Sequence, residues 1–251
     1  MTKIPIALQL YTVRDVLQED FLGTLRKVSE MGYTAVEFAG DYGKLSAHEL
    51  KKVLADLNLR PISAHIGAEA MENDPGSTID YQLEIGNNMI AIPWMPAPPD
   101  REGWIEEASR FNTLGGLLKQ NDMQLLYHNH AHEFALVNGT PGLDLLYQLA
   151  DERLLKVELD AYWVKKAGYD PAEYIRKYAG RLPVLHAKDV GAGADGPTVE
   201  VGNGILNWDE ILTAAGATGV KWVVVEQDNC QRPSLESVEI SLRYLQEKLS
   251  A

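Results

Sequence analysis

The sequence predicts a single-domain (β/α)8 barrel, the TIM-barrel class of α/β fold, from three observations. Apolar runs of strand length alternate with segments of helical period eight times along the chain. The runs are rich in Val, Ile and Leu without strict polar alternation, as expected for a parallel sheet covered by helices. The 251 residues show no linker or composition shift between the halves, so one domain over 1–251 is expected. A doubly wound open sheet is the alternative, but no GxGxxG follows the first strand, which weakens a dinucleotide-binding version.

Four strand–helix units are predicted in the first half of the chain. The first strand, Ile4–Tyr11, precedes a helix over Phe21–Met31 that Gly32 ends in the usual C-terminal position. Ser46 and Glu49 have the spacing of a capping box, so a helix is expected from Ser46 to Leu57. The other predicted segments are the strands Thr34–Phe38, Arg60–Ile66 and Met89–Trp94, the helices Ser77–Gly86 and Arg101–Asn121, and the proline-rich loop Pro93–Pro99.

The second half repeats this alternation. Its predicted strands are Met123–His130, Leu154–Asp160, Leu182–Lys188 and Lys221–Asp228. Its predicted helices are Gly142–Ala150, Pro171–Ala179, Trp208–Ala215 and Pro233–Leu249. The glycine-rich segment Gly191–Gly204 is predicted to be a long loop.

Composition narrows the class of protein. The formal charge of −13 disfavours nucleic acid and anionic membranes as partners, because an acidic surface repels phosphate groups. The single Cys230 excludes an internal disulfide and a cysteine-rich zinc site. The N-terminal residues lack the pattern of a signal peptide, and no apolar run approaches the roughly 18 residues of a membrane span. A cytoplasmic protein is therefore expected.

The stretch Tyr127–Phe134, YHNHAHEF, is the most unusual in the chain. It holds three of the six histidines and a glutamate within eight residues, directly after an apolar strand. One interpretation is a polar loop whose histidines are simply exposed to solvent. Such crowding of His, Asn and Glu favours instead a strand end that faces a ligand or metal ion.

Polar side chains also follow the other predicted strands. In a barrel the carboxyl ends of the strands form the active-site face. Nearly every predicted strand ends in a residue that ionises, coordinates or stacks. These residues are Gln9, Tyr11, Glu37, His65, Trp94, His128, His130, Glu133, Glu158, Asp160, His186, Lys188, Asp189, Glu226 and Asp228.

Residue spacing strengthens the case for a metal site. Residues two apart share a strand face, so His128 and His130 point the same way, as do three further pairs. These are Glu158 with Asp160, His186 with Lys188, and Glu226 with Asp228. Carboxylates with an imidazole suit one divalent ion such as Mn²⁺, Co²⁺ or Mg²⁺. Zn²⁺ is possible but less favoured without thiolates.

Each of these side chains also has a structural interpretation. Glu226 follows four apolar residues and could pair with Lys188 in a buried ion pair. Asp160 could cap a turn, and His186 could be a hydrogen-bonded core histidine. Glu158 could face the surrounding helices.

Six local motifs carry a family resemblance over essentially the whole chain. They are QLYTVRD at Gln9–Asp15, YHNHAHEF at Tyr127–Phe134, LDAYW at Leu159–Trp163 with AGYDP after it, LHAKD at Leu185–Asp189, VGNGILNW at Val201–Trp208 and VVVEQD at Val223–Asp228. With these motifs the chain resembles the xylose isomerase-like TIM-barrel superfamily, and within it the sugar phosphate isomerase/epimerase group. The motifs are specific for the superfamily and not for a substrate.

The resemblance implies one divalent metal ion held by Glu, Asp, His and Glu from four strand ends. It places Asp160, His186 and Glu226 at three of these positions. For the fourth, Glu133 is the predicted ligand, with His128 or His130 as the competitor. A histidine there would favour Mn²⁺, Co²⁺ or Zn²⁺ over Mg²⁺.

The first function implied is isomerisation or epimerisation of a ketose-like sugar through an enediolate. Glu133 and Glu226 are the predicted proton-transfer pair, with His128 and His130 as alternatives. Glu37 and His65 fit either packing or substrate contact. The predicted substrate-binding residues are Gln9, Tyr11, Glu37, His65, Trp94, Trp163 and Lys188.

Three other functions remain open. A lyase or dehydratase would act on a keto-sugar, keto-inositol or 3-keto-glycoside by β-elimination, since imidazole is a good acid for a leaving oxygen. A DNA-repair endonuclease is disfavoured by the charge of −13 and the lack of a multi-zinc histidine set. A non-catalytic sugar-binding protein is disfavoured by the crowded ionisable residues. Arginine is sparse at the strand ends, so a free sugar derivative is favoured over a sugar phosphate as the substrate. The resemblance also implies a possible homo-oligomer, because members of the family are often dimers or tetramers.

Overall fold

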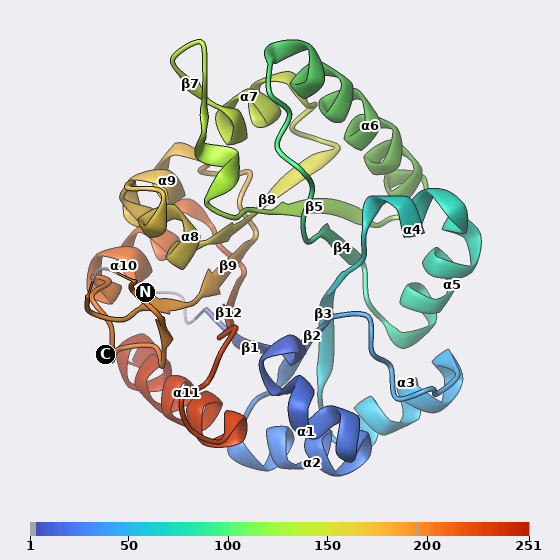
Figure 1. Cartoon of the computed structure of the whole chain (residues 1–251). Helices are drawn as coiled ribbons and strands as arrows, with labels where there is room; N and C mark the ends of the chain where they lie inside the picture. Colours follow the sequence, from blue (N-terminus) through green and yellow to red (C-terminus); the bar gives the residue numbers. More distant parts are fainter. Residues whose placement is uncertain (1–3, 194, 251) are drawn as a thin grey trace.

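Eight parallel strands close into a barrel surrounded by helices (Figure 1). The computed structural model of the chain describes residues 4–193 and 195–250. The order of strands around the barrel is β1-β12-β9-β8-β5-β4-β3-β2, which confirms the predicted (β/α)8 fold. The barrel strands are β1 Ile6–Gln9, β2 Ala35–Phe38, β3 Arg60–His65, β4 Met89–Ile92, β5 Gln124–His128, β8 Leu155–Asp160, β9 Val184–Ala187 and β12 Trp222–Val225.

The helices begin and end largely where their capping residues predict. Gly32 ends α2 with a left-handed φ of 106°, and Ser46 with Glu49 forms the predicted capping box of α3. The helices are α1 Arg14–Glu19, α2 Phe21–Met31, α3 Ala47–Asp56, α4 Ala68–Asn73, α5 Pro75–Ile85, α6 Arg101–Gln120, α7 Gly142–Leu149, α8 Ala161–Lys166, α9 Pro171–Lys177, α10 Trp208–Thr218 and α11 Ser234–Ser250. None of these helices is both long enough and apolar enough to cross a membrane.

Several short elements were not predicted, and all lie near strand ends. Helices α1, α4 and α8 have six residues each, too few to show a helical period. Two 3-10 turns follow strands, η1 Leu10–Val13 and η2 His132–Phe134. Two small antiparallel pairs complete the fold, β6 Leu136–Val137 with β7 Thr140–Pro141, and β10 Asp189–Val190 with β11 Thr198–Val199. The last pair reaches into the segment Gly191–Gly204 that was predicted to be a loop.

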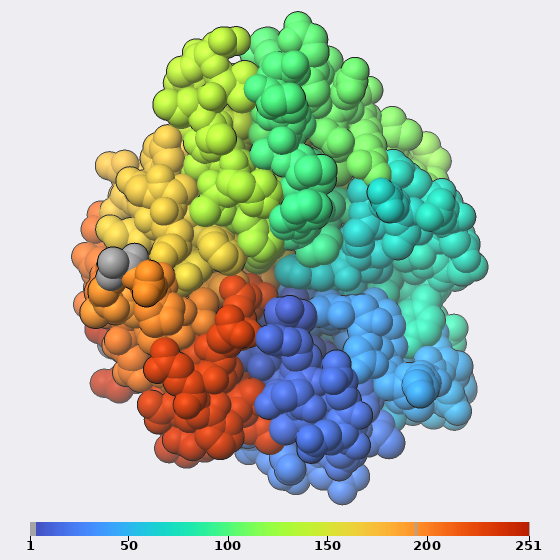
Figure 2. Space-filling view, in the orientation of Figure 1, coloured from blue at the N-terminus to red at the C-terminus, as the bar shows by residue number. Residues whose placement is uncertain are grey.

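The barrel interior changes from apolar to polar along the strands. One small buried cluster fills its centre, formed by Ala7, Ala35, Ile62, Ala91, Leu126, Val184 and Val224. Three polar residues, His128, His186 and Glu226, each lie two positions after a member of this cluster. They therefore point to the same inward face of the strands. The alternation of the strands therefore places a buried polar layer directly above the apolar centre. Segments from both ends and the middle of the chain meet around the centre of the face in Figure 2.

Candidate metal centre and pocket

Four buried side chains from neighbouring strands come together at the strand ends. His128 ends β5, Asp160 ends β8, His186 lies in β9 and Glu226 follows β12. Each offers one ligand atom, and these atoms lie within 4.8 Å of one another. Two imidazoles and two carboxylates form a donor set that can hold a divalent ion. We call these four residues the ligand group.

Asp160 provides a test of whether this set fits a cation. Its Oδ1 accepts a hydrogen bond of 3.2 Å from the backbone N–H of Trp163 and so caps α8. Its Oδ2 is buried and forms no hydrogen bond with the described residues, although it lies 3.3 Å from Nζ of Lys188. A buried carboxylate oxygen without a hydrogen bond can accept a cation, so Oδ2 fits a metal ion in addition to the nearby Lys188 ammonium. The predicted turn-capping role and the predicted ligand role use different oxygens.

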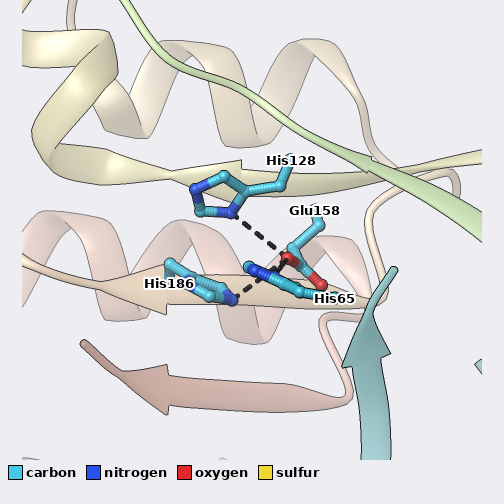
Figure 3. A group of neighbouring side chains, drawn as sticks. All are labelled: His65, His128, Glu158 and His186. Atoms are coloured by element: carbon cyan, nitrogen blue, oxygen red, sulfur yellow. Dashed lines mark hydrogen bonds and ion pairs between the residues drawn. The ribbon is translucent and has the colours of Figure 1, made fainter. Parts of the chain in front are cut away.

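A second carboxylate layer lies behind the histidines. Figure 3 shows three imidazoles around one oxygen of Glu158. Glu158 Oε1 is 2.6 Å from His65 Nε2, 3.2 Å from His128 Nδ1 and 3.2 Å from His186 Nε2. The side chain of Glu158 therefore lies inside the barrel and does not face the surrounding helices.

Glu37 completes this layer from β2. Its Oε2 lies 2.7 Å from His186 Nε2 and accepts a hydrogen bond of 2.9 Å from Gln9. On the other side of the same ring, His186 Nδ1 is 2.8 Å from Oε2 of Glu226. His128 is arranged alike, since its Nε2 faces Asp160 Oδ2 at 3.7 Å. Each histidine of the ligand group thus has one nitrogen toward that group and one toward a carboxylate behind it, the pattern that orients metal-binding histidines.

Burial and charge give the acidic and basic groups different protonation states. Burial lowers the pKa of His128 to about 4, so its imidazole is neutral at neutral pH. Burial also lowers the pKa of His130, to about 2. For His65 burial lowers the pKa, but the charges of Glu37 and Glu158 outweigh it and raise the pKa above its ordinary value. The pKa values of His65 and His130 are therefore shifted in opposite directions.

The carboxylates also differ. Burial raises the pKa of Asp160 to about 7. Burial acts in the same direction on Glu226, but the charges of Lys188 and His186 hold its pKa well below the ordinary value. The charges of Glu226, Asp160 and Asp228 more than offset burial and raise the pKa of Lys188, so it is an ammonium. The site therefore contains a fixed buried cation beside an ionised glutamate.

A cavity of about 460 Å³ opens above the ligand group. Its lining includes eight of the predicted strand-end residues: Tyr11, His65, Trp94, His128, His130, Lys188, Glu226 and Asp228. Trp163 lies next to this lining. The centroid of its ring is 5.0 Å from the centroid of the His130 ring and 5.1 Å from Nζ of Lys188. Gln9 and Glu37 are fully buried in the layer behind the histidines and do not line the cavity.

Glu133 lies apart from the ligand group. It is fully buried, with Oε1 accepting a hydrogen bond of 2.5 Å from the Tyr127 hydroxyl and Oε2 accepting one of 2.8 Å from the backbone N–H of His130. The structure brings His128, the competitor for the fourth ligand position, to Asp160, His186 and Glu226. The role of Glu133 as a ligand stays a prediction from the resemblance.

Two of the predicted strand-end residues lie in different surroundings. Asp189 turns into the following loop, where its carboxylate accepts hydrogen bonds from the backbone of that loop and from Trp208 Nε1 at 2.7 Å. Asp228 lines the cavity and lies 2.8 Å from Nζ of Lys188. The two-residue spacing that pairs Asp228 with Glu226 predicted this common side, although both residues follow the end of β12.

Comparisons with known proteins agree with the fold. A family model described as the xylose isomerase-like TIM barrel matches residues 25–248. An inosose dehydratase from Clostridium beijerinckii is 25% identical over 265 residues, and the match covers 88% of this chain and of the relative. Another from Clostridium perfringens is 34% identical over 91 residues, covering 36% of this chain and only 30% of that relative.

The solved structures include a similar protein named for the other reaction class. The crystal structure of a sugar phosphate isomerase/epimerase from Parabacteroides distasonis superposes with a TM-score of 0.87 at 25% sequence identity. The superposition covers 98% of this chain and 94% of that one. The resemblance drawn from the sequence motifs is thus confirmed, and the chain belongs to the xylose isomerase-like TIM-barrel family.

Proposed function

We propose that this protein is a metal-dependent enzyme that removes a proton next to a carbonyl of a small sugar-like substrate and then expels a group from the β-carbon. The observation that carries this proposal is the ligand group His128, Asp160, His186 and Glu226, of which His128 and Glu226 line a cavity. A divalent ion in this group would polarise a carbonyl and so acidify the adjacent C–H.

Glu226 is the proposed proton acceptor. It lines the cavity and is ionised, and its Oε2 is engaged by His186 Nδ1 at 2.8 Å and by Lys188 Nζ at 3.4 Å. Its Oε1 forms no hydrogen bond with the described residues and is available to a substrate C–H. Lys188 would offset the negative charge that develops on the substrate oxygen.

His65 is the proposed proton donor to the leaving group. Its imidazole lines the cavity, and its raised pKa keeps it protonated nearer to neutral pH than an ordinary histidine. In the proposed step the C–H proton passes to Glu226 and the C–H electron pair forms a carbon–carbon double bond. The β-carbon–oxygen bond breaks, and the oxygen leaves with a proton from His65 as water or an alcohol.

Elimination is favoured over epimerisation by the acids and bases at the cavity. Epimerisation needs a second base on the opposite face of the substrate, and Glu133, the predicted partner, is held by Tyr127 and the His130 backbone. The inosose dehydratase of Clostridium beijerinckii, similar over 88% of this chain, supports the same class. Isomerisation or epimerisation of a ketose is the second candidate, supported by the similarity to the Parabacteroides distasonis protein.

Deuterium exchange with product analysis tests the proposal. The protein is incubated with Mn²⁺ in D₂O together with ketoses, a keto-inositol and keto-glycosides, and the products are examined by NMR and mass spectrometry. Exchange beside the carbonyl with loss of water or alcohol is expected, and Glu226→Gln should abolish it. Glu200→Gln, a matched change at a buried glutamate hydrogen-bonded by Ser237, should retain it. Exchange with an unchanged molecular formula would favour the isomerase, and no exchange with any ketone would rule out proton abstraction.

A further inference from the structure

A second cavity of about 400 Å³ adjoins the first. The two cavities share His65 and Gly40 in their linings. The second is built by the segments after β2 and β3 and by helices α4 and α5, which contribute Ala70 and Tyr81. Because His65 belongs to both linings, it lies at the boundary between the two cavities.

The walls of the second cavity are suited to a ring. The rings of Tyr42 and Tyr81 lie 4.9 Å apart, and Phe38 stacks on Tyr42 at 5.1 Å. The Tyr81 hydroxyl donates to the Leu45 carbonyl at 3.0 Å, which holds its ring in place. Gln82 Nε2 donates to the Tyr42 hydroxyl at 2.8 Å and fixes the second ring. Aromatic side chains held in this way form a preorganised apolar surface.

The remaining lining restricts the charge of the occupant. Gly67 and Ala70 leave room between the aromatic rings, and Ser77 and Thr78 offer hydroxyls. Lysine, arginine, aspartate and glutamate are absent from the described lining of this cavity. A phosphate or carboxylate group would find no lysine or arginine there, whereas an uncharged ring would bury apolar surface.

We infer that the second cavity binds an uncharged ring joined through oxygen to the sugar-like part of the substrate, so that the substrate is a keto-glycoside. This inference rests on the proposed function, because it makes the ring the group that leaves. The sugar part lies in the first cavity and the glycosidic oxygen lies at His65. When the proton next to the carbonyl passes to Glu226, the double bond forms, the glycosidic C–O bond breaks and the ring departs as an alcohol with a proton from His65.

Binding of unreactive glycosides tests the second cavity without turnover. The probes are 4-nitrophenyl β-D-glucopyranoside and methyl β-D-glucopyranoside, which share a sugar and lack the ketone. Calorimetry or NMR titration of the Mn²⁺-treated protein should show the aryl glycoside binding about tenfold or more tightly, because an aromatic ring is buried. Equal affinities would overturn the inference.

Variants locate the ring. Ala70→Trp fills the second cavity from α4 and should abolish the aryl preference while leaving methyl glycoside binding unchanged. Glu69→Trp adds the same side chain at the preceding, exposed position outside the lining and should retain the preference. A preference that survives Ala70→Trp but is lost in Trp94→Ala would place the ring in the first cavity and overturn the inference.

A second pair of variants removes dependence on how Ala70→Trp folds. Tyr81→Ala should reduce the aryl preference, and Tyr81→Phe, which keeps the ring, should retain it. An unchanged preference in Tyr81→Ala would count against the ring site. Since these probes carry no ketone, failure of the elimination chemistry in D₂O and failure of ring binding are separate results.

Discussion

Asp160 holds the backbone N–H of Trp163 with one carboxylate oxygen and leaves the other oxygen to the ligand group. An Asp160→Asn change keeps an oxygen that can cap α8 and removes the charge that a cation requires. We expect the variant to fold, with unchanged far-UV circular dichroism, and to bind Mn²⁺ at least about 100-fold more weakly by calorimetry, because even an outer-shell loss costs 10–100-fold.

Asp170 provides the matched control for this prediction. It caps α9 by accepting a hydrogen bond of 2.9 Å from the backbone N–H of Glu173, and it lies outside the ligand group. Asp170→Asn should bind Mn²⁺ as the unmodified protein does. Equal Mn²⁺ affinities in the two variants would remove Asp160 from the metal centre.

Glu158 should act on metal binding through the histidines that it contacts. Glu158→Gln removes the negative charge beside His128 Nδ1 and His186 Nε2, so His128 loses the carboxylate behind it and His186 keeps only Glu37 on that side. We expect Mn²⁺ affinity to fall by about 10–100-fold with the four ligands intact. In Glu200→Gln the same substitution is made away from the histidines and should leave the affinity unchanged. Wild-type Mn²⁺ affinity in Glu158→Gln would show that this carboxylate does not position the ligands.

Metal binding should release protons and weaken as the pH falls. Burial lowers the pKa of His186, but the charges of Glu158, Glu37 and Glu226 outweigh it and raise the pKa well above the ordinary value. The metal-free histidine is therefore protonated at neutral pH and must lose its proton to coordinate. Below this raised pKa, affinity should fall about tenfold per pH unit for each proton displaced.

Calorimetry in buffers of different ionisation enthalpy measures this release directly. Burial also raises the pKa of Asp160, to about 7, so this carboxyl contributes to proton release near neutral pH. Net release of about one proton or more per Mn²⁺ at pH 7 is expected. A heat of binding that is the same in every buffer would contradict the proposed protonation of His186.

Asp189 should contribute to stability and not to metal binding. Its buried carboxylate accepts hydrogen bonds from the backbone N–H groups of Val190, Gly202, Gly204 and Leu206 and from Trp208 Nε1. Asp189→Ala leaves these donors without their acceptor, so the free energy of unfolding should fall by about 3 kcal/mol or more in denaturant titrations. Asp209→Ala, which removes an exposed carboxylate paired with Lys248, should cost less than about 1 kcal/mol. Similar losses in both variants would contradict the bridging role of Asp189.

The barrel was predictable from the sequence because its strands are continuous apolar runs and its helices carry recognisable caps. The convergence of His128, His186 and Glu226 followed from the same alternation, since each lies two residues after an inward-facing apolar residue. The alternation holds only while the chain remains extended. It therefore gave the inward position of His128 at the end of β5 but could not describe Glu133, which the turn η2 carries to Tyr127.

The rest of the site depends on contacts between distant segments. Glu158 and His65 are 93 positions apart, and no local pattern shows that one carboxylate oxygen serves three imidazoles. The short helices α4 and α8 lack a period of their own, and α8 is recognisable only from its cap Asp160. The place of Asp189 after a strand predicted a position at the active-site face of the barrel. In the structure its carboxylate instead accepts hydrogen bonds from backbone N–H groups of the glycine-rich loop, which no sequence pattern reveals.

The two adjoining cavities are made by different parts of the barrel. Strands β5, β8, β9 and β12 carry the ligand group, whereas α4 and α5 and the segments before them form the second cavity. Mutations in α4 and α5 can therefore change which attached group is accepted while the proton-transfer residues stay constant. In evolution this division would let related enzymes diversify their substrate range without rebuilding the reaction centre, with His65 as the fixed point between the two regions.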